Sequence, residues 1–257
     1  MCGYLGEISF ETIDKDSIIN SNKRIECRGP DSKRIENDKI EDIHYTFIFN
    51  RLSILDLTSE ADQPMRSLDG KSIVLFNGEI YNHMELRAKL ESKGVKFRTK
   101  RSDTEVVLNG LKEMGDDFVH ELRGQFAIAY FDLQKRNLML IRDRLGQKPI
   151  FYYLDKEKII FGSNLLSIKE KSNKTKVSEE GLREYLEKGV IQSPNTIYEK
   201  INKLKPAEII NISFKKNEIK KISKIYWNPE DFIDEKTFID DEFFNLFSES
   251  IHLRTQA

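Results

Sequence analysis

The sequence is poor in the features that mark secreted, membrane-spanning and nucleic-acid-binding proteins. It has only two cysteines, so no disulfide framework can stabilise it, and a reducing compartment such as the cytoplasm is expected. Its longest apolar runs, such as Phe126–Phe131, are too short to span a bilayer. Its first residues lack the basic and apolar pattern of a secretory signal. Basic and acidic residues nearly balance, at 42 Lys and Arg against 43 Asp and Glu, so neither nucleic acid nor a membrane surface is an expected partner.

Metal ligands are also sparse. No metal centre is predicted, because the four histidines lack the spacing of a zinc site: His44, His83, His120 and His252. Cys27 is expected to be an ordinary buried thiol. The chain has 257 residues, which is enough for one large domain, or for one domain with an appendage.

Short β-rich runs outnumber helical patterns in the first two thirds of the chain. Seven such runs predict strands, at residues 45–49, 51–55, 72–76, 126–132, 138–142, 150–154 and 159–162. A helix is predicted from an N-cap at Asn82 to a stop at Gly94, and a second from a cap at Asp103 to about Met114. Strands this short, joined mostly by short loops, favour antiparallel sheets. We therefore predict an α+β fold, a four-layer αββα sandwich in which helices cover two antiparallel sheets.

The last third of the chain has a different texture. Ser178 is predicted to cap a helix that runs to about Lys188, and residues 207–213 and 218–226 are predicted to form a hairpin. Residues 238–254 predict a helix whose apolar positions recur every four residues, which requires a surface to cover them: Ile239, Phe243, Phe247 and Ile251.

The most informative residue is Cys2, which follows the initiator methionine. If Met1 is removed, Cys2 carries both a thiol and a free α-amino group. The amine titrates near pH ~7.7–8.0 and is therefore basic enough to take the thiol proton itself. Nucleophile and base would then share one residue, as in N-terminal threonine enzymes. Taken alone, a cysteine at this position is better explained by chance.

Four further motifs each have a functional and an ordinary interpretation. Arg28-Gly-Pro-Asp31 predicts a tight turn that could form a pocket wall. Arg51 could form a forked pair with a ligand carboxylate, or be a plain surface charge. Asn77-Gly78 could donate hydrogen bonds to an oxyanion, or be a common turn dipeptide. Asp103 could bind a cation, or merely cap its helix.

Together and in this order, the motifs resemble one family. The chain is similar to the class II, or N-terminal nucleophile, glutamine amidotransferases, and most of all to the N-terminal glutaminase domain of asparagine synthetase. The resemblance extends from residue 1 to at least Trp227. It is carried by Met1-Cys-Gly, Arg28-Gly-Pro-Asp, Arg51-Leu-Ser-Ile, Gln63-Pro-Met, Phe76-Asn-Gly-Glu-Ile-Tyr-Asn, Ser102-Asp-Thr-Glu and Arg142-Asp-Arg-Leu-Gly-Gln-Lys-Pro149.

The resemblance implies a fold of the N-terminal nucleophile hydrolase type and a role for each matched residue. Cys2 would attack the side-chain amide of L-glutamine and form a thioester, with an oxyanion held by Asn77 and Gly78. Arg51 would bind the α-carboxylate, with backbone from Leu52, Ser53, Ile54 and Leu55 around it. Glu79 and Asp103 would bind the α-ammonium group.

The resemblance also implies a part that these 257 residues do not contain. In the family, a synthetase domain with a Ser-Gly-Gly-Leu-Asp-Ser type loop uses ATP and magnesium to activate aspartate and then receives the ammonia. We expect residues 1–228 to form the amidotransferase domain, which needs no cofactor, and residues 229–257 to be a linker and the first helix of a synthetase domain supplied in cis or in trans. Two alternatives stay open: an amidotransferase that serves another acceptor, such as a sugar or a carboxylic acid, and a non-catalytic module of the same fold. A homodimer also stays open.

Overall fold

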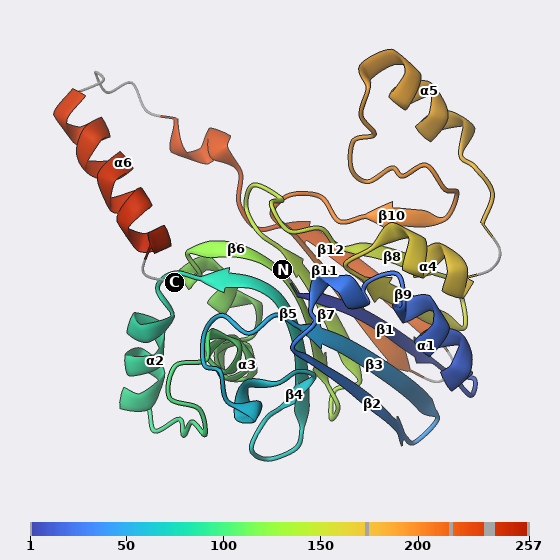
Figure 1. Cartoon of the computed structure of the whole chain (residues 1–257), viewed down its shortest axis with the longest axis horizontal. Helices are drawn as coiled ribbons and strands as arrows, with labels where there is room; N and C mark the ends of the chain where they lie inside the picture. The colour runs from blue at the N-terminus through green and yellow to red at the C-terminus, as the bar shows by residue number, and fades with distance from the viewer. Residues whose placement is uncertain (1, 173–174, 216–217, 234–239, 256–257) are drawn as a thin grey trace.

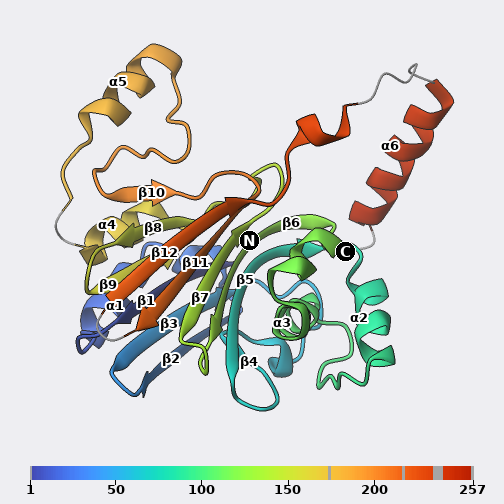
Figure 2. The same ribbon diagram turned by 180° about the vertical axis from the view of Figure 1, so that it is seen from behind.

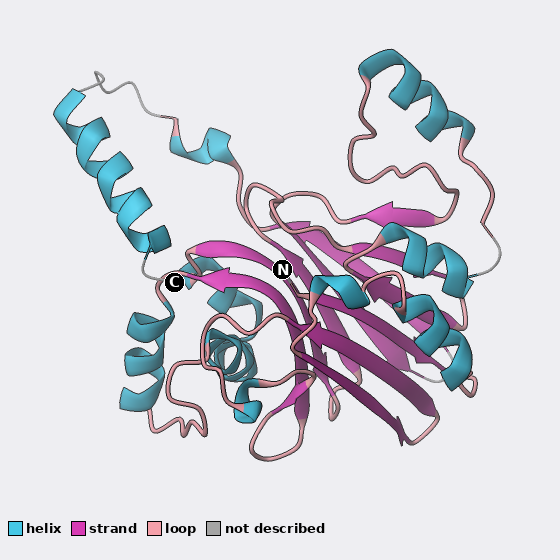
Figure 3. Cartoon of the chain, in the orientation of Figure 1, coloured by secondary structure: helices cyan, strands magenta, loops and turns pink. Residues whose placement is uncertain are grey.

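Two six-stranded antiparallel sheets form the centre of the molecule (Figure 1, Figure 3). The computed structural model describes residues 2–172, 175–215, 218–233 and 240–255. The first sheet has the strand order β10-β8-β9-β1-β3-β2, with bounds Ile201–Lys203, Phe151–Leu154, Lys158–Gly162, Gly3–Ser9, Ile43–Arg51 and Ser32–Ile40. The second has the order β12-β11-β7-β6-β5-β4, with bounds Glu218–Ile225, Glu208–Lys215, Asn137–Arg142, Gly124–Asp132, Ser72–Ile80 and Met65–Arg66.

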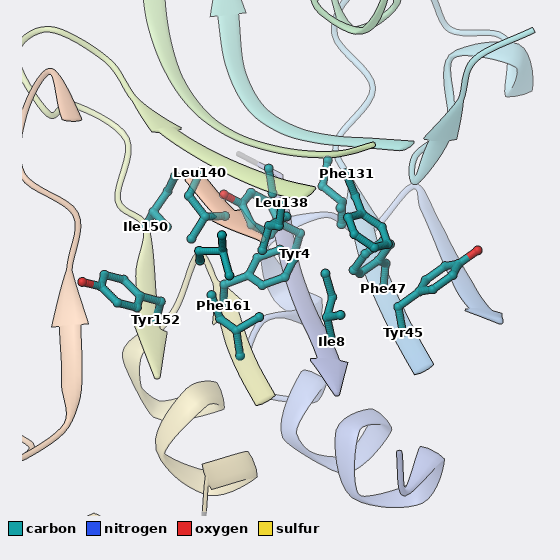
Figure 4. Close-up of a cluster of buried hydrophobic side chains, with 14 of the residues drawn as sticks. Tyr4, Ile8, Tyr45, Phe47, Phe131, Leu138, Leu140, Ile150, Tyr152 and Phe161 are labelled. Atoms are coloured by element: carbon teal, nitrogen blue, oxygen red, sulfur yellow. The ribbon is translucent and has the colours of Figure 1, made fainter. Parts of the chain in front are cut away.

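The main hydrophobic core lies between the two sheets (Figure 4). Successive side chains of a strand point to opposite faces, and β1 shows the consequence. Tyr4 and Ile8 point into the inter-sheet core, whereas Leu5 packs on the outer face. Rings from the two sheets meet edge to face, with the centroids of Phe47 and Phe131 5.9 Å apart. This interdigitation holds the sheets at a fixed spacing.

Helices cover the outer faces and complete four layers (Figure 1, Figure 2). Helices α1 (Lys15–Asn22) and α4 (Leu165–Ser172) pack on the first sheet. Helices α2 (His83–Ser92) and α3 (Asp103–Met114) pack on the second. The short 3₁₀ segments are η1 (Glu26–Arg28), η2 (Ser59–Ala61), η3 (Gly115–Glu121) and η4 (Pro229–Phe232). The predicted α+β sandwich of antiparallel sheets is therefore confirmed.

Two helices project from this body, as both ribbon views show (Figure 1, Figure 2). Helix α5 (Glu179–Lys188) begins at the predicted cap, because the Ser178 side chain accepts a hydrogen bond from Gly181 N. Helix α6 (Asp240–Thr255) matches the predicted helix, although Ile239 of its apolar stripe lies outside the described residues. Its remaining stripe is about half exposed, at 47% for Phe243, 53% for Phe247 and 48% for Ile251. Among the described residues, no helix is long and apolar enough to cross a membrane.

Three predictions about local structure are wrong in instructive ways. Residues 52–55 are not a strand, since β3 ends at Arg51 and the backbone N–H groups of Leu52 and Ser53 bond to Cys2 Sγ and Asp31 Oδ2 instead of a neighbouring strand. Cys27 is exposed rather than buried, whereas Ile25 in the same segment is fully buried.

The cap of α3 also differs from the prediction. Ser102, and not Asp103, accepts the capping hydrogen bond from Glu105 N. This leaves the Asp103 carboxylate available for another role. At α2 the predicted N-cap position is correct, but the Asn82 side chain makes no capping bond. It instead binds Glu121 O and Arg123 N and ties α2 to the segment before β6.

Candidate active site

The nucleophile candidate, Cys2, is held from two sides at the start of β1. Leu52 N donates a hydrogen bond to Cys2 Sγ at 3.3 Å, and Arg28 Nε donates to the Cys2 carbonyl oxygen at 3.1 Å. Burial raises the pKa of the Cys2 thiol, while the Leu52 N–H and the charge of Arg51 act in the opposite direction. A thiol whose pKa is raised needs a base close by to become a nucleophile. The motif around Arg28 therefore shapes the site by fixing the main chain that carries the nucleophile.

An unpaired hydrogen-bond donor lies in the same pocket. Asn77 is 2% exposed, and within the described residues its Nδ2 has no hydrogen-bond acceptor. A buried donor without a partner costs roughly 1–3 kcal/mol, so a ligand atom or a water that accepts from Asn77 Nδ2 is expected in this pocket. Next to it, Gly78 lies against the opposite strand, since an added Cβ would approach Gln125 O to 2.2 Å. Only glycine allows β5 to lie this close to β6 at this position.

Two carboxyl groups form the acidic side of the pocket. Asp103 accepts a hydrogen bond from Ile80 N at 3.3 Å and is 7% exposed. Burial raises its pKa to about 7, with a smaller upward contribution from Glu79. Burial also raises the pKa of Glu79 itself, against the attraction of Lys148. A bound cation would favour the ionised form of both groups, so this side of the pocket suits an ammonium group.

Arg51 lies at the end of β3 and lines the pocket, but its guanidinium is already engaged. It donates to the carbonyl oxygens of Leu55, Asp56 and Thr58 and to the Asp62 carboxylate. The sequence predicted a guanidinium group free to pair with a carboxylate. The structure instead shows it hydrogen-bonded to the loop of residues 52–62, which forms the pocket wall.

One pocket brings together nearly all of the residues that the sequence indicated. Its lining includes nine of them: Cys2, Arg51, Leu52, Ile54, Leu55, Asn77, Gly78, Glu79 and Asp103. Ser53 is not part of the lining. Its N–H instead donates to Asp31 Oδ2 at 2.7 Å, which ties the loop to the Arg28–Asp31 turn.

The pocket also has lining residues that the sequence reasoning did not assign: Ala61, Gln63, Phe76, Ser102, Thr104, Gln125 and Lys148. Gln63 braces the site, because its amide bonds to both Phe76 N and Phe76 O on β5. Lys148 adds a second cation. The main chain of Lys148 is held by the preceding turn, because its backbone N–H donates to Asp143 Oδ2 and its carbonyl oxygen accepts from Arg142 Nε. Both lie in motifs that carried the family resemblance, which is the signal that could have identified them.

No group of three or more metal-ligating side chains occurs in the described parts of the chain. The chemistry available in the pocket is thus a thiol, an amide donor, two carboxyl groups and two cations. That set suits attack on a carbonyl carbon of a small zwitterion.

Comparison with known proteins identifies the family. Residues 1–227 match the family model described as a glutamine amidotransferase domain. The chain belongs to this family. A relative from Methanocaldococcus jannaschii that carries the name of a glutamine-hydrolyzing asparagine synthetase is 32% identical over 100% of this chain. Asparagine synthetase [glutamine-hydrolyzing] 1 of Bacillus subtilis is 33% identical over 82% of it. The chain spans only 53% and 33% of the lengths of these two relatives.

Solved structures support the same fold. The glutamine phosphoribosylpyrophosphate amidotransferase of Bacillus subtilis superposes on this amidotransferase domain with a TM-score of 0.59 at 17% identity, covering 86% of this chain and 49% of that one. A structure titled as the allosteric regulatory enzyme of purine biosynthesis gives a TM-score of 0.60 at 16% identity, with 86% and 48% covered. The predicted N-terminal nucleophile hydrolase type of fold and the resemblance to asparagine synthetase glutaminase domains are confirmed.

Proposed function

We propose that this chain is the glutaminase part of a glutamine-dependent asparagine synthetase. The single observation that carries the proposal is the meeting of the Cys2 thiol, the unpaired Asn77 amide and the two acids in one pocket. The relatives named above support the choice of asparagine synthetase over other amidotransferases.

The proposed chemistry proceeds in two steps. The Cys2 thiol gives its proton to the α-amino group of the same residue, and Sγ attacks the side-chain amide carbon of L-glutamine. Asn77 Nδ2 and Gly78 N–H stabilise the oxyanion of the tetrahedral intermediate. The carbon–nitrogen bond then breaks, the amine returns the proton to the leaving nitrogen, and ammonia departs. Water attacks the resulting thioester, which releases glutamate and restores the thiol.

Substrate recognition follows from the charges around the pocket. The α-ammonium group of glutamine is proposed to bind Glu79 and Asp103, whose ionised forms it would favour. The α-carboxylate is proposed to bind Arg51 and the backbone of the loop that contains Leu52, Ser53, Ile54 and Leu55. An amide without these charges would leave buried ionic groups unpaired, so the pocket would reject it.

The second half-reaction is assigned to another domain. We propose that residues 1–228 form the amidotransferase domain and that residues 229–257 lead toward an ATP- and magnesium-dependent domain, in cis or in trans, that amidates aspartate. The amidotransferase domain itself would need no cofactor and would act in the cytoplasm. Another acceptor, such as a sugar or a carboxylic acid, is the alternative that identification of the partner domain tests.

The proposal is tested by measuring glutamate release from glutamine. Intact mass should first show that Met1 has been removed, because only then is the α-amine of Cys2 free. The chain and its Cys27→Ala variant are expected to release glutamate, whereas Cys2→Ala is expected to release none. Cys27 is the matched control, since it is a free and exposed cysteine outside the pocket. A chain with a free Cys2 that releases no glutamate would support the non-catalytic alternative.

A further inference from the structure

Nearly all hydrogen-bond donors of the Arg51 guanidinium group are used by acceptors in the loop that follows it. Nη1 donates to Thr58 O at 2.9 Å and to Asp62 Oδ1 at 2.7 Å, while Nη2 donates to Leu55 O at 3.3 Å and to Asp56 O. These contacts account for four of the five N–H donors of an arginine. The Arg51 side chain is 7% exposed. A substrate carboxylate can therefore bind Arg51 only by replacing some of these partners.

The partners at the two ends of the guanidinium differ in kind. At Nη1 one of the two partners is the Asp62 carboxylate, the other being Thr58 O, and charge-assisted hydrogen bonds are roughly twice as strong as neutral ones. Asp62 is itself anchored to β2, because it accepts from Ser32 Oγ at 3.0 Å and pairs with Arg34 Nε at 3.0 Å. At Nη2 the partners are two neutral carbonyl groups of the loop. The Nη2 end is thus the end that can exchange.

The loop bends where that exchange would take place. Asp56 has a φ of 50°, a left-handed conformation that aspartate tolerates better than most residues. Its carboxylate accepts from Thr58 N at 3.2 Å, which closes the turn locally. Asp62 follows the η2 segment, and its side chain is 9% exposed. The loop thus has a firmly anchored end at Asp62 and a separate turn at Asp56.

We infer that Asp62 is a positioning residue for the substrate carboxylate. It holds Nη1 of Arg51 in the pocket wall, so that the Nη2 and Nε edge can take a carboxylate in place of the carbonyl groups of Leu55 and Asp56. Two parallel donors on one edge match the two oxygens of a carboxylate. The inference rests on the proposed function, because it takes glutamine as the ligand. Asp62 does not line the pocket, so it acts through Arg51 and should affect binding rather than chemistry.

The test measures binding in a chain that cannot turn over, the full chain with Cys2→Ala, by titration calorimetry. The two probes are L-glutamine and L-glutaminamide, which lacks the charged α-carboxylate. Asp62→Ala should weaken glutamine binding by about tenfold, a typical size for a coupled pair, and should change glutaminamide binding little. Glu60→Gln, which removes an exposed acid from the same loop, should change neither. In a chain with Arg51→Ala, adding Asp62→Ala should have no further effect.

Three results would overturn the inference. They are an equal loss of affinity for both probes, tighter glutamine binding by Asp62→Ala, and an undiminished Asp62 effect in the Arg51→Ala chain. Asp62→Asn serves if Asp62→Ala does not fold, since it keeps the size and an acceptor oxygen while removing the charge, and the same selective loss is expected of it. Glutamate release is measured separately with Cys2 in place. A chain that shows the Asp62 effect but releases no glutamate contradicts the proposed function and leaves this inference standing.

Discussion

Replacing Asp103 by asparagine should stabilise the folded chain while it damages the binding site. The Asp103 carboxyl is 7% exposed, and burial raises its pKa from 3.8 to about 7. Hydrogen bonds from the backbone N–H groups of Ile80 and Thr104 favour the ionised carboxylate, but they do not offset the cost of removing its charge from water. The charge of the nearby Glu79 disfavours the ionised form further. Asparagine keeps an oxygen that can accept from Ile80 N–H and carries no charge. The substitution therefore removes the cost of ionisation without removing the hydrogen bond.

The size of this gain depends on pH, with a sign that follows from proton binding. Because the folded pKa is the higher one, the unfolded chain holds fewer protons between pH 3.8 and about 7, and stability falls as the pH rises through this window. The difference of about 3 pKa units corresponds to at most about 4 kcal/mol at pH values above the window. Below it, both states are protonated and the cost vanishes. Asp103→Asn should thus gain stability progressively as the pH rises above 3.8, and the full gain should be present above about pH 7.

Urea unfolding of Asp103→Asn and of the unchanged chain measures the gain in stability, which should be large at pH ~8.5 and small at pH ~4. Asp69→Asn is the matched control with the opposite sign. Hydrogen bonds from Ser67 and Lys112 lower the pKa of Asp69 to about 2, so its ionised form stabilises the fold above the ordinary aspartate pKa, and that stability is lost as the pH falls toward 2. The control should therefore lose stability at pH ~8.5. An Asp103→Asn chain that gains nothing there, or gains equally at both pH values, would refute the reasoning about burial.

Three further outcomes are expected. Asn77→Ala should lower kcat by ~10²–10³, the usual effect of losing one oxyanion donor, while Arg51→Ala should mainly raise KM. Steady-state kinetics with the opposite pattern would mean that the two roles are wrongly assigned. Gly78→Ala should abolish glutaminase activity and lower Tm, because its Cβ would lie 2.2 Å from Gln125 O, and a fully active variant would contradict the close strand contact. In limited proteolysis followed by mass spectrometry, the segment after Trp227 should be cleaved before the two sheets. Equal protection of this segment and of the sheets would place the domain boundary elsewhere.

Periodicity predicted the elements that depend on burial, and motif order predicted the residues that share the pocket. Strand β6 is recognisable as a continuous run of buried apolar residues, and helix α3 by apolar residues at helical spacing. Leu52–Leu55 has the same apolar character, yet it is a loop, because its backbone donors bond to Cys2 and Asp31, which are distant in sequence. No local pattern contains that information. The partnership of Arg51 with Asp62 was missed for the same reason.

The site depends on the packing of the whole sandwich, since its groups come from different layers. Arg51 belongs to the first sheet and Cys2 directly precedes its strand β1, whereas Asn77 and Gly78 belong to the second sheet and Asp103 to a helix outside the second. The distance between nucleophile and oxyanion donors is thus set by the core between the sheets. Tyr4 follows the nucleophile by two residues, and Ala127 pairs with Asn77; both are fully buried in that core. Because protein interiors are close-packed and resist compression, a core that sets this spacing also preorganises the reaction geometry.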